Sequence, residues 1–162
     1  MSIAVYPGSF DPISYGHVDL AERGLKIFDE LIVAVARNVA KQMLFSPEER
    51  AEMVREVFKD VPGVTVDSFE GMTVDYVTGC GANVMLRGIR TVTDFEYEFQ
   101  MALINSHFAD EIETVFMMTS NKYSFLSSRF IKEAVALGGD VSDFVPPLVE
   151  QRLREKLANR NP

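Results

Sequence analysis

Short apolar segments recur along the chain, separated by longer stretches in which apolar residues return every three or four positions. The apolar segments predict five strands, over 3–6, 31–36, 64–69, 84–86 and 114–118. The second of these is apolar throughout, which is typical of a strand covered on both faces of a parallel sheet. The periodicity between the strands predicts helices. Strands and helices that alternate in this way predict an α/β fold, a doubly wound five-stranded parallel sheet with right-handed crossovers.

Capping signals place the starts of three predicted helices. Ser46 and Glu49 have the spacing of a capping box, as do Thr93 and Glu96, and Ser127 precedes a further helix. The helix after Thr93 is expected to run to about residue 109, with apolar side chains available for packing: Phe95, Phe99, Ala102, Leu103 and Phe108. The last helix, 148–157, is rich in charge and is expected to be a solvated surface element.

Length and composition indicate one domain over residues 1–162. With 162 residues, 47% of them hydrophobic, the chain can bury a core without disulfides. Its single cysteine, Cys80, excludes an internal disulfide and is compatible with a reducing cytoplasm. No apolar run reaches the length of a membrane span and no signal peptide is recognised, so a cytoplasmic protein is expected. The formal net charge of -8 argues against a general nucleic-acid binder, and any anionic ligand would need a local basic cluster.

The segment after the first strand has the pattern of a phosphate-binding loop. Pro7 and Pro12 exclude a continued strand, and a helical pattern begins at Gly16 and His17. The expected apolar face of this first helix consists of Val18, Ala21, Leu25 and Phe28. A strand, a glycine loop and a helix N-terminus direct backbone N–H groups and the positive end of the helix dipole to one place. Ser9 adds a hydroxyl and His17 an imidazole. The alternative interpretation is a structural turn followed by a capping histidine.

Further polar and basic residues follow the predicted strands at the same end. In chain order they are Ser9, His17, Arg37, Lys41, Thr73, Arg87, Arg90 and Lys122, the last beside a serine cluster. Because the carboxyl ends of parallel strands share one edge, these side chains are expected to meet there and bind a polyphosphate. Most other basic residues, Arg50 among them, fall within predicted helices. Other interpretations stay open for part of the set: Arg87 and Arg90 as a plain surface pair, and Lys41 as a solvated lysine.

Four segments of the sequence resemble a known family. They are Pro7-Gly8-Ser9-Phe10-Asp11-Pro12 with Ser14-Tyr15-Gly16-His17, Arg87-Gly88-Ile89-Arg90, Asp94-Phe95-Glu96-Tyr97-Glu98, and Tyr123-Ser124-Phe125-Leu126-Ser127-Ser128. Together they resemble the nucleotidyltransferases that carry a T/HxGH motif, and among these the bacterial phosphopantetheine adenylyltransferases. Ser14 favours this branch, because the nicotinamide and glycerol-phosphate nucleotidyltransferases usually have a second histidine there. The resemblance covers nearly the whole chain and implies a Rossmann-like nucleotidyltransferase fold with a C-terminal helix.

The resemblance also implies a set of site residues. ATP would be contacted by Ser9, Phe10, His17, Gly88, Ile89, Arg90, Glu98, Tyr123, Ser124, Phe125, Leu126, Ser127, Ser128 and Arg129. The 4′-phosphopantetheine side would be contacted by Ser9, Lys41, Thr73 and Arg87. Ser9 replaces the commoner threonine but keeps the hydroxyl. Arg129 stands where many members have a small hydroxyl residue, which leaves its orientation and role open.

The implied reaction is in-line attack by the terminal phosphate of 4′-phosphopantetheine on the α-phosphorus of ATP, which yields dephospho-coenzyme A and pyrophosphate. The nucleophile is already ionised near neutral pH, so no general base is required. Catalysis would rest on His17, Lys41 and Arg90: the first two stabilise charge on the α-phosphate, while Arg90 and the helix start at Ser127 hold the pyrophosphate. Mg2+ would be held mainly by the phosphates, because no His, Cys or carboxylate spacing indicates a protein-held metal.

The family resemblance further implies a homohexamer, and coenzyme A is a candidate feedback ligand. Three other functions stay open at this point. One is adenylyl or cytidylyl transfer to another phosphate acceptor, against which Ser14 and Lys41 argue. Another is nucleotide binding or sensing without turnover, which loss of His17 or Arg90 would have supported. The third, a synthetase fragment that acts on transfer RNA, conflicts with the negative charge of the chain.

Overall fold

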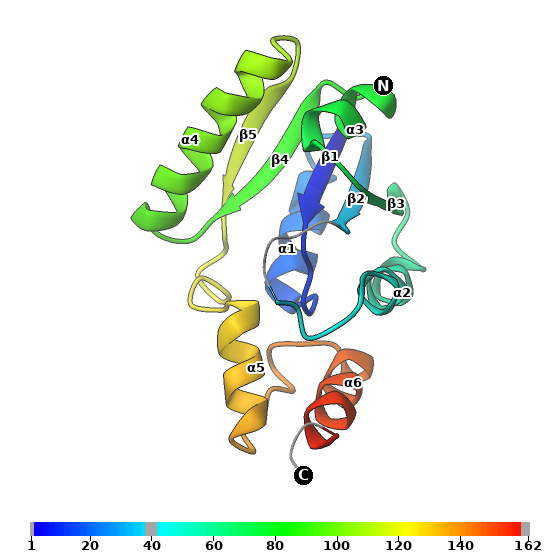
Figure 1. The fold of residues 1–162 in the computed structure, drawn as a ribbon, viewed down its shortest axis with the longest axis vertical. Coiled ribbons are helices and arrows are strands. Elements are labelled where there is room, and N and C mark those ends of the chain that lie inside the picture. The colour runs from blue at the N-terminus through cyan, green and yellow to red at the C-terminus, as the bar shows by residue number, and fades with distance from the viewer. Residues whose placement is uncertain (1, 38–41, 160–162) are drawn as a thin grey trace.

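The computed structural model describes residues 2–37 and 42–159 and contains a five-stranded parallel sheet in the order β3-β2-β1-β4-β5 (Figure 1). The strands are β1 (Ile3–Gly8), β2 (Glu30–Ala36), β3 (Val64–Phe69), β4 (Val84–Ile89) and β5 (Glu113–Met118). The helices are α1 (Tyr15–Gly24), α2 (Pro47–Phe58), α3 (Thr73–Gly79), α4 (Val92–Phe108), α5 (Ser128–Ala136) and α6 (Pro147–Ala158). The predicted fold class and its five strands are therefore confirmed.

Helices cover both faces of the sheet, as the uninterrupted apolar strands require. Successive residues of a strand point to opposite faces, so Ala4 and Tyr6 belong to one buried cluster and Val5 to another. The first cluster receives side chains of α1, α2, α5 and α6, whereas the second receives Val74 and Val77 of α3. The core is thus split by the sheet into two layers, which fix the positions of the loops at its carboxyl edge.

The direction of winding changes between β1 and β4, and there the two strands separate. They are paired only at Ala4 with Val84 and at Val5 with Met85. Beyond those residues β1 stays paired with β2 as far as Gly8, while β4 stays paired with β5. The carboxyl ends of the two central strands therefore diverge, which opens a crevice where ligands of doubly wound folds bind.

Three details of the sequence-based prediction are wrong. Helix α4 begins after Thr91, whose hydroxyl accepts the amide N–H of Asp94 at 3.1 Å, so the expected cap at Thr93 lies inside the helix. The last helix is not a solvated element, because Val149 and Leu153 are fully buried against the core and only its other faces carry charge. The expected apolar face of the first helix extends to Phe28, but α1 ends at Gly24 and Phe28 packs from the turn that follows.

Helix α4 lies at the β5 edge and exposes much of its apolar surface (Figure 1). None of its residues is buried, and Leu103 is 57% and Phe108 61% exposed. An apolar face of this size on one helix is unusual for a surface that meets only water. In the part of the chain that the structure describes, no helix combines the length and apolarity needed to cross a membrane.

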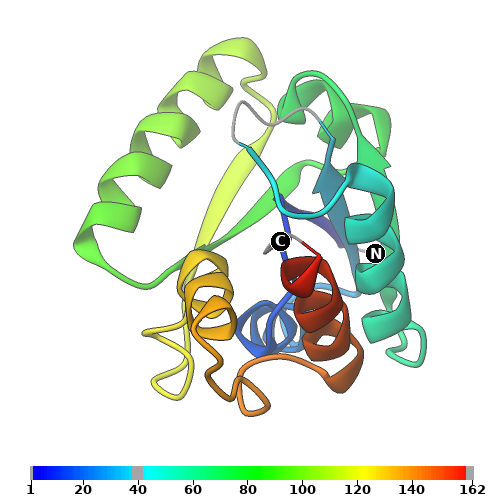
Figure 2. The same cartoon turned by 60° about the horizontal axis from the view of Figure 1, so that its bottom comes forward.

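The carboxylate of Asp11 joins three segments near the carboxyl ends of the strands. It is 2% exposed and accepts the backbone N–H groups of Leu44 and Phe45 at 3.0 and 2.9 Å and the Lys132 ammonium at 2.7 Å. Lys132 belongs to α5, which lies beside α6 and beyond the carboxyl end of β1 (Figures 1 and 2). The hydroxyl of Ser128 also donates to the carbonyl of Pro12 at 2.8 Å. The first loop, the segment before α2 and helix α5 are therefore held in register.

We expect Asp11→Asn to lower the free energy of unfolding by about 3 kcal/mol. The mostly buried ammonium of Lys132 loses its anionic partner, and one of the two acceptor oxygens becomes an NH2 donor that faces other donors. Denaturant unfolding measures the change. The control is Glu133→Ala, which removes an ion pair with the 88% exposed side chain of Arg129 and should cost less than about 1 kcal/mol. Equal small losses in both variants would contradict a structural role for the Asp11 carboxylate.

Candidate active site

A pocket of about 260 Å³ occupies the crevice between the carboxyl ends of β1 and β4. It is bounded by the loop after β1, the start of α1, the end of β4, the start of α4 and the start of α5. Most of the expected site residues line it: Ser9, Phe10, His17, Arg87, Gly88, Arg90, Glu98, Tyr123, Leu126, Ser127 and Ser128. Segments far apart in the sequence therefore meet at one site, as the strand-end argument predicts.

Other expected residues lie elsewhere. Ile89, Ser124, Phe125 and Arg129 do not line this pocket, and the 88% exposed side chain of Arg129 pairs with Glu133 along α5 at 2.9 Å. Thr73 lines a smaller, adjoining pocket of about 110 Å³. Lys41 lies outside the described residues. The side chain of Phe10 is 2% exposed and packs edge-on against Tyr6 and His17.

The imidazole of His17 is held in one tautomer by the backbone. The amide N–H of Ser14, the residue before α1, donates to Nδ1 of His17 at 3.0 Å. An amide N–H is always a donor, so Nδ1 is an acceptor and the ring proton of the neutral form must be on Nε2. Burial, followed by the positive charges of Arg90 and Arg87, lowers the pKa of His17 to about 4. At neutral pH the residue is an uncharged N–H donor, not a cation.

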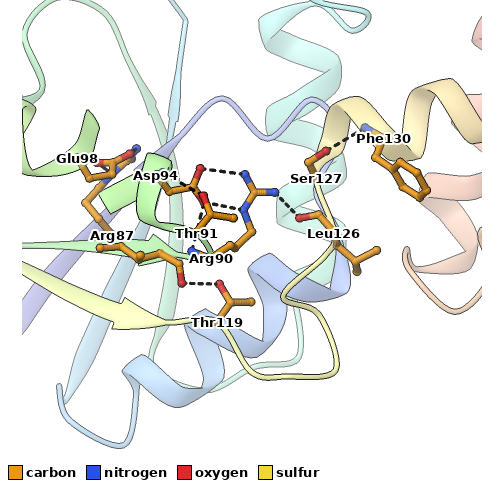
Figure 3. A network of polar contacts seen from close by, with 10 residues as sticks. Arg87, Arg90, Thr91, Asp94, Glu98, Thr119, Leu126, Ser127 and Phe130 are labelled. Atoms are coloured by element: carbon orange, nitrogen blue, oxygen red, sulfur yellow. Dashed lines mark hydrogen bonds and ion pairs between the residues drawn. The ribbon is translucent and has the colours of Figure 1, made fainter. Parts of the chain in front are cut away.

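Arg90 is fixed between the start of α4 and the loop before α5 (Figure 3). Its Nε donates to Asp94 at 3.0 Å, and its Nη1 donates to the carbonyl oxygen of Leu126. Asp94 is in turn held by the cap, because its N–H donates to Thr91. The guanidinium is therefore positioned at the pocket wall before any ligand arrives.

Arg87 bridges the gap between the diverging strands. Its Nε and Nη2 form a bidentate pair with Glu98 of α4, at 2.8 and 2.5 Å, and its Nη1 donates to the carbonyl of Pro7 at the end of β1. Burial works against the charged form, but the bonds to Glu98 prevail and raise the pKa of Arg87. Side chains from β4 and α4 thus replace the hydrogen bonds that β1 and β4 no longer share.

The smaller pocket adjoins the larger one, and Pro7, Arg87 and Glu98 line both. Its remaining lining is mostly uncharged and comes from α3, α4 and the sheet: Thr73, Met85, Tyr97, Met101, Ala102, Asn105 and Thr114. An elongated ligand with an anionic end could place that end at Arg87 and the rest of its length in this pocket.

Comparisons with known proteins show the family of this chain. Residues 5–134 match the cytidylyltransferase-like family. A phosphopantetheine adenylyltransferase from Syntrophotalea carbinolica is 58% identical over 95% of this chain and 93% of its own length. The chain belongs to the phosphopantetheine adenylyltransferase family. A second phosphopantetheine adenylyltransferase, from Caldanaerobacter subterraneus subsp. tengcongensis, is 53% identical over 96% of this chain and 98% of its own.

A more distant solved structure shares the fold of this phosphopantetheine adenylyltransferase family member. It is that of a proposed nicotinate-nucleotide adenylyltransferase from Vibrio parahaemolyticus, with a TM-score of 0.69 and 20% sequence identity. The match covers 94% of this chain and 99% of that one. At this identity the likeness concerns the fold alone, which is the doubly wound sheet described above.

The charges in the pocket of this family member are balanced among the described residues. Arg87 and Arg90 each face a carboxylate, Glu98 and Asp94, and His17 is neutral. Two other basic residues expected at this edge do not line the pocket. Arg37 pairs with Glu48 and Glu70, and Lys122 lies over the ring of Tyr123. Of the basic residues expected at this edge, Arg87 and Arg90 therefore line the pocket, and both have carboxylate partners.

Sequence reasoning missed two residues with clear roles in this arrangement. Asp94 holds Arg90, and its position four residues after that arginine on a helix start was a usable signal. Thr119, directly after β5, lines the pocket and donates its hydroxyl to the carbonyl of Ile89 at 3.2 Å (Figure 3). No sequence signal reveals Thr119, because its partner lies on a different strand.

We expect NMR titration to find His17 neutral, with its proton on Nε2, down to a pKa of about 4. An unfolded chain takes up this proton near pH 6.5, so the stability present above pH 6.5 is lost as the pH falls toward 4. The loss is at most about 3 kcal/mol, because one pKa unit is about 1.4 kcal/mol and the ring keeps some solvent contact. The free energies of unfolding of the wild type and of His17→Gln, measured in urea, should converge as the pH falls through this window. A difference between the two that does not change with pH would refute the low pKa.

Proposed function

We propose that the protein transfers the adenylyl group of ATP to 4′-phosphopantetheine, which yields dephospho-coenzyme A and pyrophosphate. The single observation that carries the proposal is the neutral Nε2–H donor of His17 beside the glycine loop in the crevice between β1 and β4. Relatives that are 52–58% identical over nearly the whole chain are named for this activity.

The two pockets suggest how the substrates would lie. The triphosphate would occupy the larger pocket, with Arg90 and the start of α5 near its β- and γ-phosphates. The pantetheine arm would occupy the smaller pocket beside Thr73, with its phosphate near Arg87. Because Pro7, Arg87 and Glu98 line both pockets, the nucleophilic phosphate would meet the α-phosphorus at their junction. This arrangement supplies the proximity on which phosphoryl-type transfer depends.

The chemical step would need no proton acceptor from the protein. A phosphate oxygen of 4′-phosphopantetheine forms a bond to the α-phosphorus, and the bond from that phosphorus to the bridging oxygen of pyrophosphate breaks. His17 would donate its Nε2–H to an α-phosphate oxygen as negative charge develops there. It could not act as a base at the same time, because Nδ1 is occupied by the amide of Ser14. The residue thus stabilises the transition state by position and dipole.

The balanced charge of the pocket leaves a need for cations when ATP is bound. We propose that Lys41 and Mg2+ meet this need, with Lys41 near the α-phosphate. Among the described residues no cluster of His, Cys, Asp and Glu is arranged to hold a metal, and both pocket carboxylates are engaged by arginines. Mg2+ would therefore bind through the phosphates and neutralise part of their charge.

The activity is tested by incubation with ATP, Mg2+ and 4′-phosphopantetheine and detection of dephospho-coenzyme A by mass. We expect His17→Ala to lower kcat by about 100- to 1,000-fold, because one preorganised donor is lost, and to change the Kd for ATP by less than about threefold. His107→Ala, the only other histidine, is the control and should retain turnover. Product formation with another phosphate acceptor, or ATP binding without pyrophosphate release, would favour the competing functions.

We also propose that the protein is a cytoplasmic homohexamer and that coenzyme A, which carries the same pantetheine arm, competes for the two pockets. The exposed apolar face of α4 supports self-association, because burying it between chains would remove it from water. Six chains of 18.2 kDa would have a mass of about 109 kDa.

Light scattering after size exclusion should report that mass for the wild type and a smaller one for Leu103→Asp, because the new carboxylate would be buried in the interface. Leu137→Asp is the matched control: this leucine is 89% exposed and lies at the end of α5, away from α4. A hexamer that survives Leu103→Asp would show that this face is not the contact.

A further inference from the structure

Arg50 is a buried cation behind the phosphate-binding loop. It belongs to α2, and the whole residue is 1% exposed. Its Nη1 donates to two carbonyl oxygens, that of Ser9 at 2.6 Å and that of Ala36 at 2.9 Å. Its Nε is buried without a partner among the described residues. Arg50 therefore ties the end of β2 to the loop after β1.

No carboxylate in the described part of the chain forms an ion pair with Arg50. The negative charges of Asp11 and Glu48 are close enough to favour the charged form of Arg50. Asp11, however, accepts hydrogen bonds from Lys132 and two backbone amides, and Glu48 pairs with Arg37. Burial outweighs these influences and lowers the pKa of Arg50. A buried charge that is matched only by carbonyl dipoles is costly, and a nearby anion would lower that cost.

The contact with Ser9 also sets the direction of a peptide group. The C=O and N–H of the trans peptide between Ser9 and Phe10 point in opposite directions, so the N–H of Phe10 points away from Arg50. Gly8, Ser9 and Phe10 line the larger pocket, whereas Arg50 does not, so the loop lies between the guanidinium and the ligand space. In the described ranges no acceptor pairs with the N–H of Ser9 or of Phe10.

The backbone of Phe10 adopts a conformation that needs support. Its φ is 47°, in the left-handed region, which costs a non-glycine residue on the order of 1–2 kcal/mol. Such a turn leaves successive N–H groups unpaired and directed to one side, as in anion-binding nests. The bond from Arg50 holds the carbonyl on the other side, and the positive charge there polarises the peptide so that its N–H becomes a stronger donor.

We propose that Arg50 is a positioning residue of the phosphate site: it holds the amide donors of the Ser9–Phe10 loop toward the ligand, and its buried charge favours a bound phosphate over an uncharged group. The choice of ligand for the test rests on the proposed function. The positioning role itself depends only on the bond between Arg50 and the Ser9 carbonyl, and it would apply to any phosphate bound at the Ser9–Phe10 loop.

The test compares Arg50→Lys, Arg50→Gln and the control Arg55→Gln, which alters an exposed arginine of the same helix. Calorimetry measures the Kd of 4′-phosphopantetheine, of pantetheine, which lacks the phosphate, and of inorganic pyrophosphate. Gln keeps a donor for the carbonyls but loses the charge, so Arg50→Gln should weaken both phosphate-bearing ligands about tenfold and pantetheine less than twofold. Arg50→Lys keeps the charge and should stay within about threefold of wild type, and Arg55→Gln within twofold.

A loss of affinity that is equal for pantetheine and its phosphate, or no loss in Arg50→Gln, would overturn the assignment. Thermal unfolding checks each variant. If Arg50→Gln does not fold, the wild type is titrated with pyrophosphate and followed by NMR. Pyrophosphate should shift the amide signals of Ser9 and Phe10, and unshifted signals would overturn the proposal. Phosphate selectivity that depends on Arg50 in a protein that forms no dephospho-coenzyme A would uphold this role and refute the proposed function.

Discussion

The structure depends on the separation of two neighbouring strands. β1 and β4 share only two residue pairs, and beyond these each stays bonded to its outer neighbour. Opposite directions of winding on the two sides of β1 leave this gap uncovered by a crossover helix. The loop after β1, the start of α1 and the start of α5 all border it, so residues that are more than a hundred positions apart contribute to one pocket.

The electrostatics of the pocket follow from how its charges are held. Arg87 spans the gap with a bidentate bond to Glu98 and a bond to the carbonyl of Pro7. Arg90 donates hydrogen bonds to Asp94 and to the carbonyl of Leu126. Paired in this way, the arginines are rigid but partly neutralised. In the proposed reaction, the triphosphate would therefore meet oriented hydrogen-bond donors more than an excess of positive charge. A neutral histidine is consistent with this design, because its N–H adds a directed dipole without further repulsion between cations.

Local patterns predicted the elements and several of the residues that line the pocket, such as Ser9, His17, Arg87 and Arg90. Apolar runs marked the five strands, and the loop from Pro7 to His17 carried its own glycine, proline and capping signals. The predictions were wrong where the local sequence was compatible with two different structures. Thr91 and Thr93 are both acceptable caps, and the charged residues of α6 masked Val149 and Leu153, which share its buried face.

Long-range contacts could not be predicted from the sequence. The partners Arg50 and Ser9 are 41 positions apart, and Arg87 and Pro7 are 80 apart, so no periodicity links them. Strand order is equally non-local, because alternating strands and helices are compatible with several sheets. The ion pairs of Arg87 and Arg90 could not be predicted either, because the spacing of these arginines in the sequence is equally compatible with unpaired cations.

One contact in the pocket has a consequence for how the sequence could vary. The amide N–H of residue 14 donates to Nδ1 of His17, and the hydroxyl of Ser14 lies 3.1 Å from the same nitrogen. Every amino acid except proline offers that amide, so the acceptor role of Nδ1 does not depend on the hydroxyl of Ser14. A substitution at position 14 by any residue except proline should therefore leave the ring proton of His17 on Nε2.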